Sequence, residues 1–228
     1  MARDQAVDIP TQLSLGVRLL QAQAHNNGGV IHFCHTSCAL FDGGPVESYL
    51  ATVKAFLDAN PNEVLTMIFT NPEGLSLPGQ WEPAFKNSGI MDLAYVPPHL
   101  PMKQSDWPTL GNMIDIGKRV VVFLDEGANG SDGGVVDFIL PEFDMVRMNT
   151  ILSHFPIIRS DNYAAWFQVW ESPFSVTDPE FPCSVNRISG SLSAADHMYM
   201  INHSLDVKII GVLISDPTDA PTTNGIPS

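Results

Sequence analysis

His35 is the residue of this chain best placed to carry acid–base chemistry, because it closes a short apolar run over residues 30–35. An imidazole gains and loses its proton near neutral pH, so it can serve as a general acid or a general base. If the run is a strand of a parallel sheet, His35 lies at the carboxyl end, where α/β folds place their sites. The alternative is a structural histidine, and the residue alone does not separate the two interpretations.

Three further polar side chains occupy positions from which they could assist such a histidine. Asp125 follows the apolar run 120–124, and we expect it to orient His35 or to hold a substrate hydroxyl. A helix cap or loop carboxylate is the alternative for Asp125. Gln21 and Gln23 share one face of an expected strand, because side chains alternate along it. Their amides can donate to phosphate oxygens or bond backbone groups inside a core.

The three cysteines, Cys34, Cys38 and Cys183, are too few for a disulfide framework. Cys34 and Cys38 can pair in an oxidising compartment, which leaves Cys183 over. A zinc site made from these cysteines and the nearby histidines is disfavoured, because strand alternation divides the ligands between two faces. We therefore predict a disulfide between Cys34 and Cys38, with no metal ion and no other cofactor.

Alternating strands and helices must position these residues. Residues 30–35 and 64–69 are apolar strand candidates on either side of a helix over 45–59, whose apolar residues recur at helical spacing. We expect this βαβ unit to place both strands in parallel in one sheet. Further expected elements are helices over 9–15, 83–94 and 110–116 and strands over 17–24, 119–125, 197–203 and 207–214. The pattern predicts one α/β domain over residues 1–228.

Composition limits the partners. The chain has 228 residues, 11 basic and 25 acidic, and its formal net charge is −14. Because no basic stripe occurs, nucleic acid and anionic membrane surfaces are disfavoured partners. No apolar run approaches the roughly 18 residues of a transmembrane helix. The first residues also lack the apolar core of a signal peptide. The oligomeric state stays open.

Several motifs, taken in this order, resemble the phosphatidylinositol-specific phospholipase C X-domain superfamily. The resemblance is greatest to the secreted, fungal-type PLC-like phosphodiesterases. The motifs are His-Phe-Cys-His-Thr-Ser-Cys at 32–38, Asp-Gly-Gly-Pro at 42–45, Phe-Leu-Asp-Ala-Asn-Pro-Asn-Glu-Val at 56–64, the segments 16–23, 106–111 and 117–125, and Asn202-His203. They extend over most of the chain and are specific as a set, although each alone is weak.

The resemblance implies a TIM-type (β/α) barrel and metal-independent cleavage of a lipid, glycerophospho or inositol phosphodiester. In such a reaction a general base takes a proton from the substrate's own hydroxyl, and a general acid protonates the leaving alkoxide. His35 matches the general acid. Gln21 and Gln23 match positions where relatives carry charged residues, so we expect them to bind substrate, although two amides are poor ligands for Ca²⁺ or Mg²⁺. Asn202 and His203 are expected to shape the pocket, and secretion is implied as well.

The chain departs from the family pattern in three places. The strand that carries the first catalytic histidine has no counterpart before Gln12, and the last barrel strands expected after residue 225 are missing. We therefore expect a barrel that is incomplete at both ends. Residues 146–168 match nothing in the family pattern, and we interpret them as a retained intron or, as a second choice, a surface insertion. The alternative function is accordingly an inactive or truncated relative, acting as a binding protein or not at all.

Overall fold

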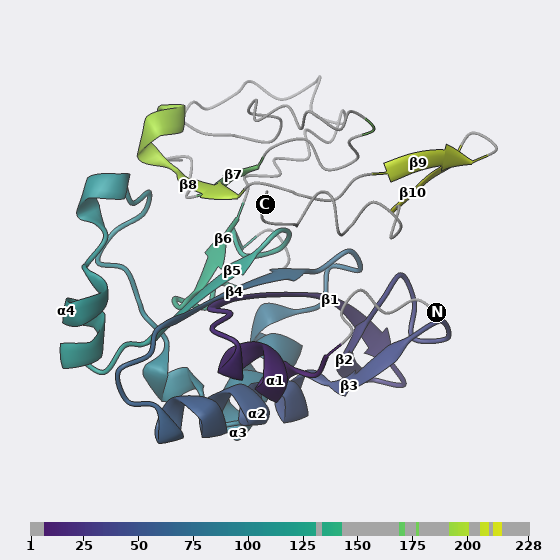
Figure 1. Cartoon of the computed structure of the whole chain (residues 1–228), viewed down its shortest axis with the longest axis horizontal. Helices are drawn as coiled ribbons and strands as arrows, with labels where there is room; N and C mark the ends of the chain where they lie inside the picture. The colour runs from purple at the N-terminus through teal and green to yellow at the C-terminus, as the bar shows by residue number, and fades with distance from the viewer. Residues whose placement is uncertain are drawn as a thin grey trace, which may run out of the picture.

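A computed structural model of the chain describes residues 7–130, 134–142, 169–171, 177, 192–200, 206–209 and 212–215. Its main feature is a six-stranded sheet with the order β3-β2-β1-β4-β5-β6 (Figure 1). The strands are β1 (Leu19–Asn27), β2 (Val30–Cys34), β3 (Asp42–Pro45), β4 (Leu65–Thr70), β5 (Val120–Leu124) and β6 (Ile139–Pro141). β1, β4, β5 and β6 run parallel, whereas β2 and β3 extend the sheet as antiparallel neighbours.

The hairpin of β1 and β2 replaces the predicted βαβ unit. β2 is antiparallel to β1, and it is β1 that pairs in parallel with β4. The prediction that residues 30–35 and 64–69 form parallel strands is therefore wrong. The cause is the two-residue turn Gly28-Gly29, with φ of 62° and 90°. Glycine adopts such angles without steric cost, and turns of this kind match the twist of a hairpin.

Three helices cover one face of the sheet: α1 (Ile9–Ser14), α2 (Val46–Ala59) and α3 (Glu82–Asn87) (Figure 1). The buried residues of α2 recur at helical spacing and are Val46, Leu50, Val53 and Leu57. They pack with the strand side chains that point to the same side, which include Leu20, Leu65, Met67, Phe69, Val120 and Val122. Burial of each such side chain contributes about 1.5–3 kcal/mol. The predicted α/β class is confirmed.

An aromatic cluster fastens the hairpin to the helix-covered core. The ring of Phe33 on β2 lies 4.8 Å, between centroids, from both Tyr49 on α2 and Phe69 on β4. Trp81 stacks on Phe69 at 5.6 Å. Burial raises the pKa of the Tyr49 hydroxyl well above its ordinary value, because the charged phenolate is penalised away from water. The hairpin is therefore held in place by packing as well as by its ladder.

A smaller apolar cluster covers part of the opposite face. There Met113 of α4 (Leu110–Asp115) packs with Ile68, Phe123 and Leu140 of the sheet. The short helical turns are η1 (Leu77–Trp81), η2 (Met91–Leu93), η3 (Gln104–Asp106) and η4 (Ala194–Asp196). The remaining strands form two pairs, β7 (Val169–Glu171) with β8 (Met198–Met200), and β9 (Asp206–Ile209) with β10 (Val212–Ser215).

The six-stranded sheet is open, with β3 and β6 at its edges. A closed barrel is therefore not shown by the described strands, and the TIM-type architecture stays a prediction. Residues 146–168, like Cys183, lie outside the described residues. Within the described ranges, no helix combines the length and the apolar character needed to cross a bilayer.

Candidate functional site

A row of polar side chains marks the carboxyl ends of the parallel strands. Gln23 of β1 lies opposite Thr70 of β4, and Asp125 and Glu142 directly follow β5 and β6. These positions alternate with residues such as Phe69 that pack toward the helices, so the row belongs to the other face. Sequence reasoning identified Gln23 and Asp125 but missed Thr70 and Glu142. The signal for both was a polar residue directly at the end of an apolar strand.

His35 reaches the same edge although β2 runs against the parallel strands. Residues 19–23 of β1 pair with β4, and residues 24–27 pair with β2. β2 therefore starts beyond the edge and returns to it, where the backbone N–H of Thr36 donates to Gln23 Oε1 at 3.1 Å. The structure thus places His35 at the carboxyl edge by means of a hairpin rather than a parallel strand.

The turn that carries His35 is closed by a disulfide. Cys34 and Cys38 are joined with a Cα–Cα distance of 4.9 Å. Within this loop the N–H of Ser37 donates to the His35 carbonyl oxygen at 2.6 Å. The N–H of His35 donates to the Phe41 carbonyl oxygen at 3.1 Å. The backbone of His35 is therefore held on both sides, whereas most surface loops have no such covalent constraint.

Thr36, the next residue, has a strained backbone. Its φ is 62°, and among the described residues it is the single non-glycine residue with positive φ. A β-branched side chain in this region costs about 1–3 kcal/mol, so it persists only where the surroundings impose it. The disulfide and the bond from Thr36 to Gln23 supply that constraint. In the structure Gln23 is thus a support for the His35 turn, and Gln21 is an exposed neighbour on the same face.

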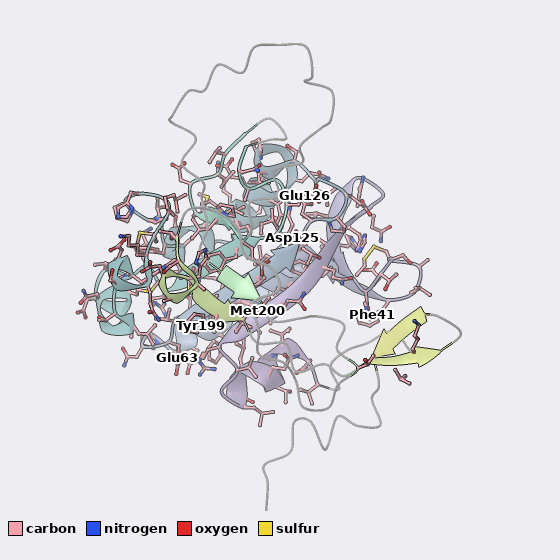
Figure 2. The ribbon with its side chains drawn as sticks, turned by 90° about the horizontal axis from the view of Figure 1, so that it is seen from above. Phe41, Glu63, Asp125, Glu126, Tyr199 and Met200 are labelled. Atoms are coloured by element: carbon pink, nitrogen blue, oxygen red, sulfur yellow. A yellow bond between two sulfur atoms is a disulfide. The ribbon has the colours of Figure 1, made fainter. Side chains whose placement is uncertain are left out.

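Asp125 ties two loops together at the carboxyl edge. Its Oδ1 accepts the backbone N–H of Asn71 at 2.7 Å, and Asn71 is fully buried. The Asn71 amide in turn donates to the carbonyl oxygens of Leu75 and Glu126, at 3.1 and 3.2 Å. Asp125 and Glu126, both labelled in Figure 2, directly follow β5. The loop-carboxylate interpretation of Asp125 is therefore present in the structure, beside the polar row.

His25 forms a pair with a carboxylate that sequence reasoning did not foresee. His25 Nδ1 lies 2.8 Å from Glu73 Oε1, and Glu73 Oε2 accepts the N–H of Asn26 at 3.0 Å. The bond to His25, and then that to Asn26, lower the pKa of the Glu73 carboxyl. The available signal was that His25 shares a face with Gln21 and Gln23, but nothing in the sequence links it to Glu73.

His32 forms a second, similar pair one strand away. His32 lies opposite His25 in the hairpin, and its Nδ1 is 2.8 Å from Asp42 Oδ1. Asp42 also accepts the N–H of Gly44 at 2.8 Å and the amide of Asn27 at 3.0 Å. The bond to His32, followed by that to Gly44, lowers the pKa of the Asp42 carboxyl. Asp42 thus stabilises the backbone at Gly44 as well as the orientation of the His32 ring.

The other predicted site residues are not placed. Asn202 and His203 lie outside the described residues. Over the described ranges, no group of three or more histidine, cysteine or acidic side chains is arranged to hold a metal ion. What the edge does offer is the turn of His35, the His25 imidazole fixed by a carboxylate, amides and a carboxylate at a strand end. Such groups can bind an anion and transfer protons.

Comparison with known proteins agrees with the sequence motifs. The family model described as PI-PLC X 1 matches residues 1–162 and 153–228. A "PI-PLC X domain-containing protein 1" of Arthroderma benhamiae is 37% identical over 227 residues, which is 98% of this chain and 65% of the relative. An "Uncharacterized secreted protein" of the same fungus is 37% identical over 212 residues, covering 92% of this chain and 42% of the relative.

A plant protein shows a weaker similarity. A PI-PLC X domain-containing protein of Arabidopsis thaliana is 31% identical over 140 residues, which is 58% of this chain and 32% of the relative. The chain therefore spans between 32% and 65% of the length of these relatives. No solved structure matches it significantly. Because the two matches to the family model together extend over the whole sequence, the chain belongs to the PI-PLC X domain family.

Proposed function

We propose that this chain carries the general acid of a PLC-like phosphodiesterase and that His35 is this acid. The observation that carries the proposal is the constrained turn at the carboxyl edge, closed by Cys34–Cys38 and bonded to Gln23. Residues with a strained backbone cluster at functional sites, and Thr36 directly follows His35. Membership of the PI-PLC X domain family supports the phosphodiester as the substrate class.

The proposed reaction moves one proton onto the enzyme and one off it. A base accepts the proton of a substrate hydroxyl next to the diester, and that oxygen forms a bond to phosphorus. The bond from phosphorus to the leaving oxygen breaks, and protonated His35 gives its proton to the leaving alkoxide. In this proposal Gln21 and Gln23 donate to phosphoryl oxygens, Asp125 holds a substrate hydroxyl or orients His35, and Asn202 and His203 line the pocket. The reaction needs no metal ion.

The test is phosphodiesterase activity on a chromogenic inositol-phosphate diester and on a glycerophosphodiester. His35→Ala should lower kcat at least 100-fold, since general acid catalysis contributes about 10²–10⁴-fold. His99→Ala is the matched control, because His99 is an exposed histidine of the 96–108 loop. Activity should persist in EDTA. Because the chain spans only part of its relatives, a form extended to the length of the fungal relative should be assayed beside it.

Three outcomes would contradict the proposal. Unchanged kcat in His35→Ala would remove His35 from the reaction. Silence of both the 228-residue chain and the extended form, with melting curves that show folded protein, would favour a non-catalytic binding protein of the same family. Loss of activity in EDTA would contradict the metal-independent route.

We also propose that the protein is secreted and that its complete fold is a TIM-type barrel. Secretion is supported by the Cys34–Cys38 disulfide, which is typical of oxidising compartments, and by the similarity to a fungal relative named as a secreted protein. The barrel is supported by the parallel ladder of β1, β4, β5 and β6 with helices α1, α2 and α3 on one face. Detection of the protein in culture medium tests the first part, and an experimental structure of the extended form tests the second.

A further inference from the structure

One ring nitrogen of His25 forms a hydrogen bond, and the other has no partner among the described residues. Nδ1 bonds Glu73, whose second oxygen is taken by Asn26, so the ring orientation is determined by the loop after β4. The His25 side chain is 12% exposed, and its Nε2 is buried with no hydrogen-bond partner among the described residues. Buried polar atoms are almost always bonded, so an exception calls for an explanation. A hydrogen bond from Nε2 to a polar atom of a bound ligand would satisfy it.

A second unpartnered atom lies at the same edge. Thr70 Oγ1 is also buried without a hydrogen-bond partner in the described part of the chain. Thr70 is opposite Gln23, and His25 follows Gln23 by two residues on the same face. Two residues of a strand span about 6.6 Å. The residues of both unpartnered atoms, His25 and Thr70, therefore flank Gln23, which also accepts a hydrogen bond from the turn of His35.

Positive charge at this edge would strengthen the binding of an anionic diester. The two described arginines are elsewhere: Arg18 precedes β1 and bonds Glu63, and Arg119 precedes β5 and bonds backbone carbonyls. Gln21 and Gln23 contribute hydrogen bonds but no charge. An imidazolium whose Nδ1–H is held by a carboxylate supplies both a charge and a directed Nε2–H donor.

We propose that His25, oriented by Glu73, contacts the phosphodiester directly and that its Nε2–H donates to a non-bridging phosphoryl oxygen. The inference rests on the proposed function, because it takes the phosphodiester as the ligand. His25 is then a substrate-contacting residue distinct from His35, and Glu73 is a positioning residue. The charged and titratable groups around His25 are Glu73 from the loop after β4, His32 from β2, and Asp42 from β3 through His32.

Binding of dimethyl phosphate tests the contact without turnover. This diester keeps one negative charge across the histidine range, and it has no neighbouring hydroxyl to react. Its affinity is measured by ³¹P NMR titration. His25→Gln should bind dimethyl phosphate at least about tenfold more weakly than the wild type does.

Two variants separate contact from structural support. Glu73→Gln keeps the His25 ring but removes the charge beside it. It should therefore weaken dimethyl phosphate binding, but less than His25→Gln does. It should also raise KM for the chromogenic diester more than it lowers kcat. His32→Gln is the matched control, because it breaks the equivalent pair with Asp42 one strand away. It should bind as the wild type does. Melting curves establish that each variant is folded.

The outcomes distinguish this inference from the proposed function. Equal affinity in His25→Gln and wild type, or an equal loss in His32→Gln, overturns the contact. If His25→Gln does not fold, unchanged affinity in a folded Glu73→Gln variant overturns it as well. Binding that depends on His25, without turnover of any diester, supports the contact and contradicts the enzymatic proposal. Turnover that is unaffected by His25→Gln contradicts the contact and supports the enzymatic proposal.

Discussion

The two ends of the parallel strands use their polar side chains in opposite ways. At the amino ends Arg119 is 8% exposed, and its Nη1 donates to the carbonyl oxygens of Leu57, Asn60 and Glu63. Arg18 there bonds the Glu63 carboxylate at 2.6 Å. At the carboxyl ends, by contrast, the His25 imidazole is bonded to Glu73 through one nitrogen, and its other nitrogen and Thr70 Oγ1 are buried without partners in the described part.

The difference indicates a division of labour. Arg119 donates hydrogen bonds to carbonyl groups at the end of α2 and in the loop that follows, where a cation also complements the helix dipole. Its hydrogen bonds complete the fold and leave little for a ligand. The carboxyl ends keep donors and acceptors available, as a binding site requires. Substitutions at the amino ends should therefore change stability, and those at the carboxyl ends should change the proposed chemistry.

The largest stability effect should come from Arg119→Met. Three carbonyl groups lose a buried donor, so the free energy of unfolding should fall by about 3 kcal/mol. Urea unfolding followed by tryptophan fluorescence measures this, and diesterase activity per folded molecule should not change. Lys54→Met, on the exposed surface of α2, should stay within about 0.5 kcal/mol of the wild type. Equal midpoints for these two variants would contradict the division between the ends.

Removing the Cys34–Cys38 disulfide should have the next largest effect. The closed loop is short, so the double Cys→Ser variant should lose about 2 kcal/mol of stability, chiefly because its unfolded chain is less restricted. Unlike Arg119→Met, it should also lower diesterase activity under conditions where the protein is fully folded, because the His35 turn is released. Full activity of the folded double variant would show that the disulfide does not position His35.

Thr36→Gly should separate strain from stability. Glycine adopts the φ of 62° without strain, so stability should stay constant or rise by up to about 1 kcal/mol. Activity should fall, because the turn gains freedom. Thr36→Val, which keeps the β-branch, is the control and should be no more stable than wild type. A marked loss of stability in Thr36→Gly would show that the threonine side chain itself holds the turn.

The smallest effects should come from exposed ion pairs at acidic pH. The bond to Arg18 lowers the pKa of the Glu63 carboxyl from 4.5, and the bond to His25 does the same for Glu73. A lowered carboxyl pKa gives stability that is present above 4.5 and lost as the pH falls through the folded-state value. Thermal melting should therefore show a falling Tm below this pH. Glu63→Gln and Glu73→Gln should each flatten the fall, slightly because exposed pairs are weak. Identical pH profiles for all three proteins would contradict these pairings.

Elements with a strong apolar pattern could be predicted from the sequence, and those formed by tertiary contacts could not. The helix over 45–59 and the strands near 64–69 and 119–125 correspond to α2, β4 and β5. β3 was missed because two glycines and a proline are poor strand formers. It exists because β2 pairs with it, and a Cβ on Gly43 would lie 2.9 Å from the Phe33 carbonyl oxygen.

The site shows the same limit. His35 and Asp125 could be singled out because each follows an apolar run. The partners of the other histidines could not, because Glu73 is 48 residues from His25 and meets it only through the β1–β4 pairing. The hairpin itself could have been predicted from the sequence, since Gly28-Gly29 between two strand candidates is a turn signal. Weighing that signal would have reversed the direction predicted for β2.

The edges of the six-stranded sheet have a consequence for solubility. Both outer strands, β3 and β6, are short and end in proline, at Pro45 and Pro141. Proline has no N–H to offer, and short edges give an incoming strand little to pair with. Among the described strands, these two edges are thus poor templates for edge-to-edge aggregation. Replacing Pro45 or Pro141 with Val should increase self-association, which light scattering at rising protein concentration would detect.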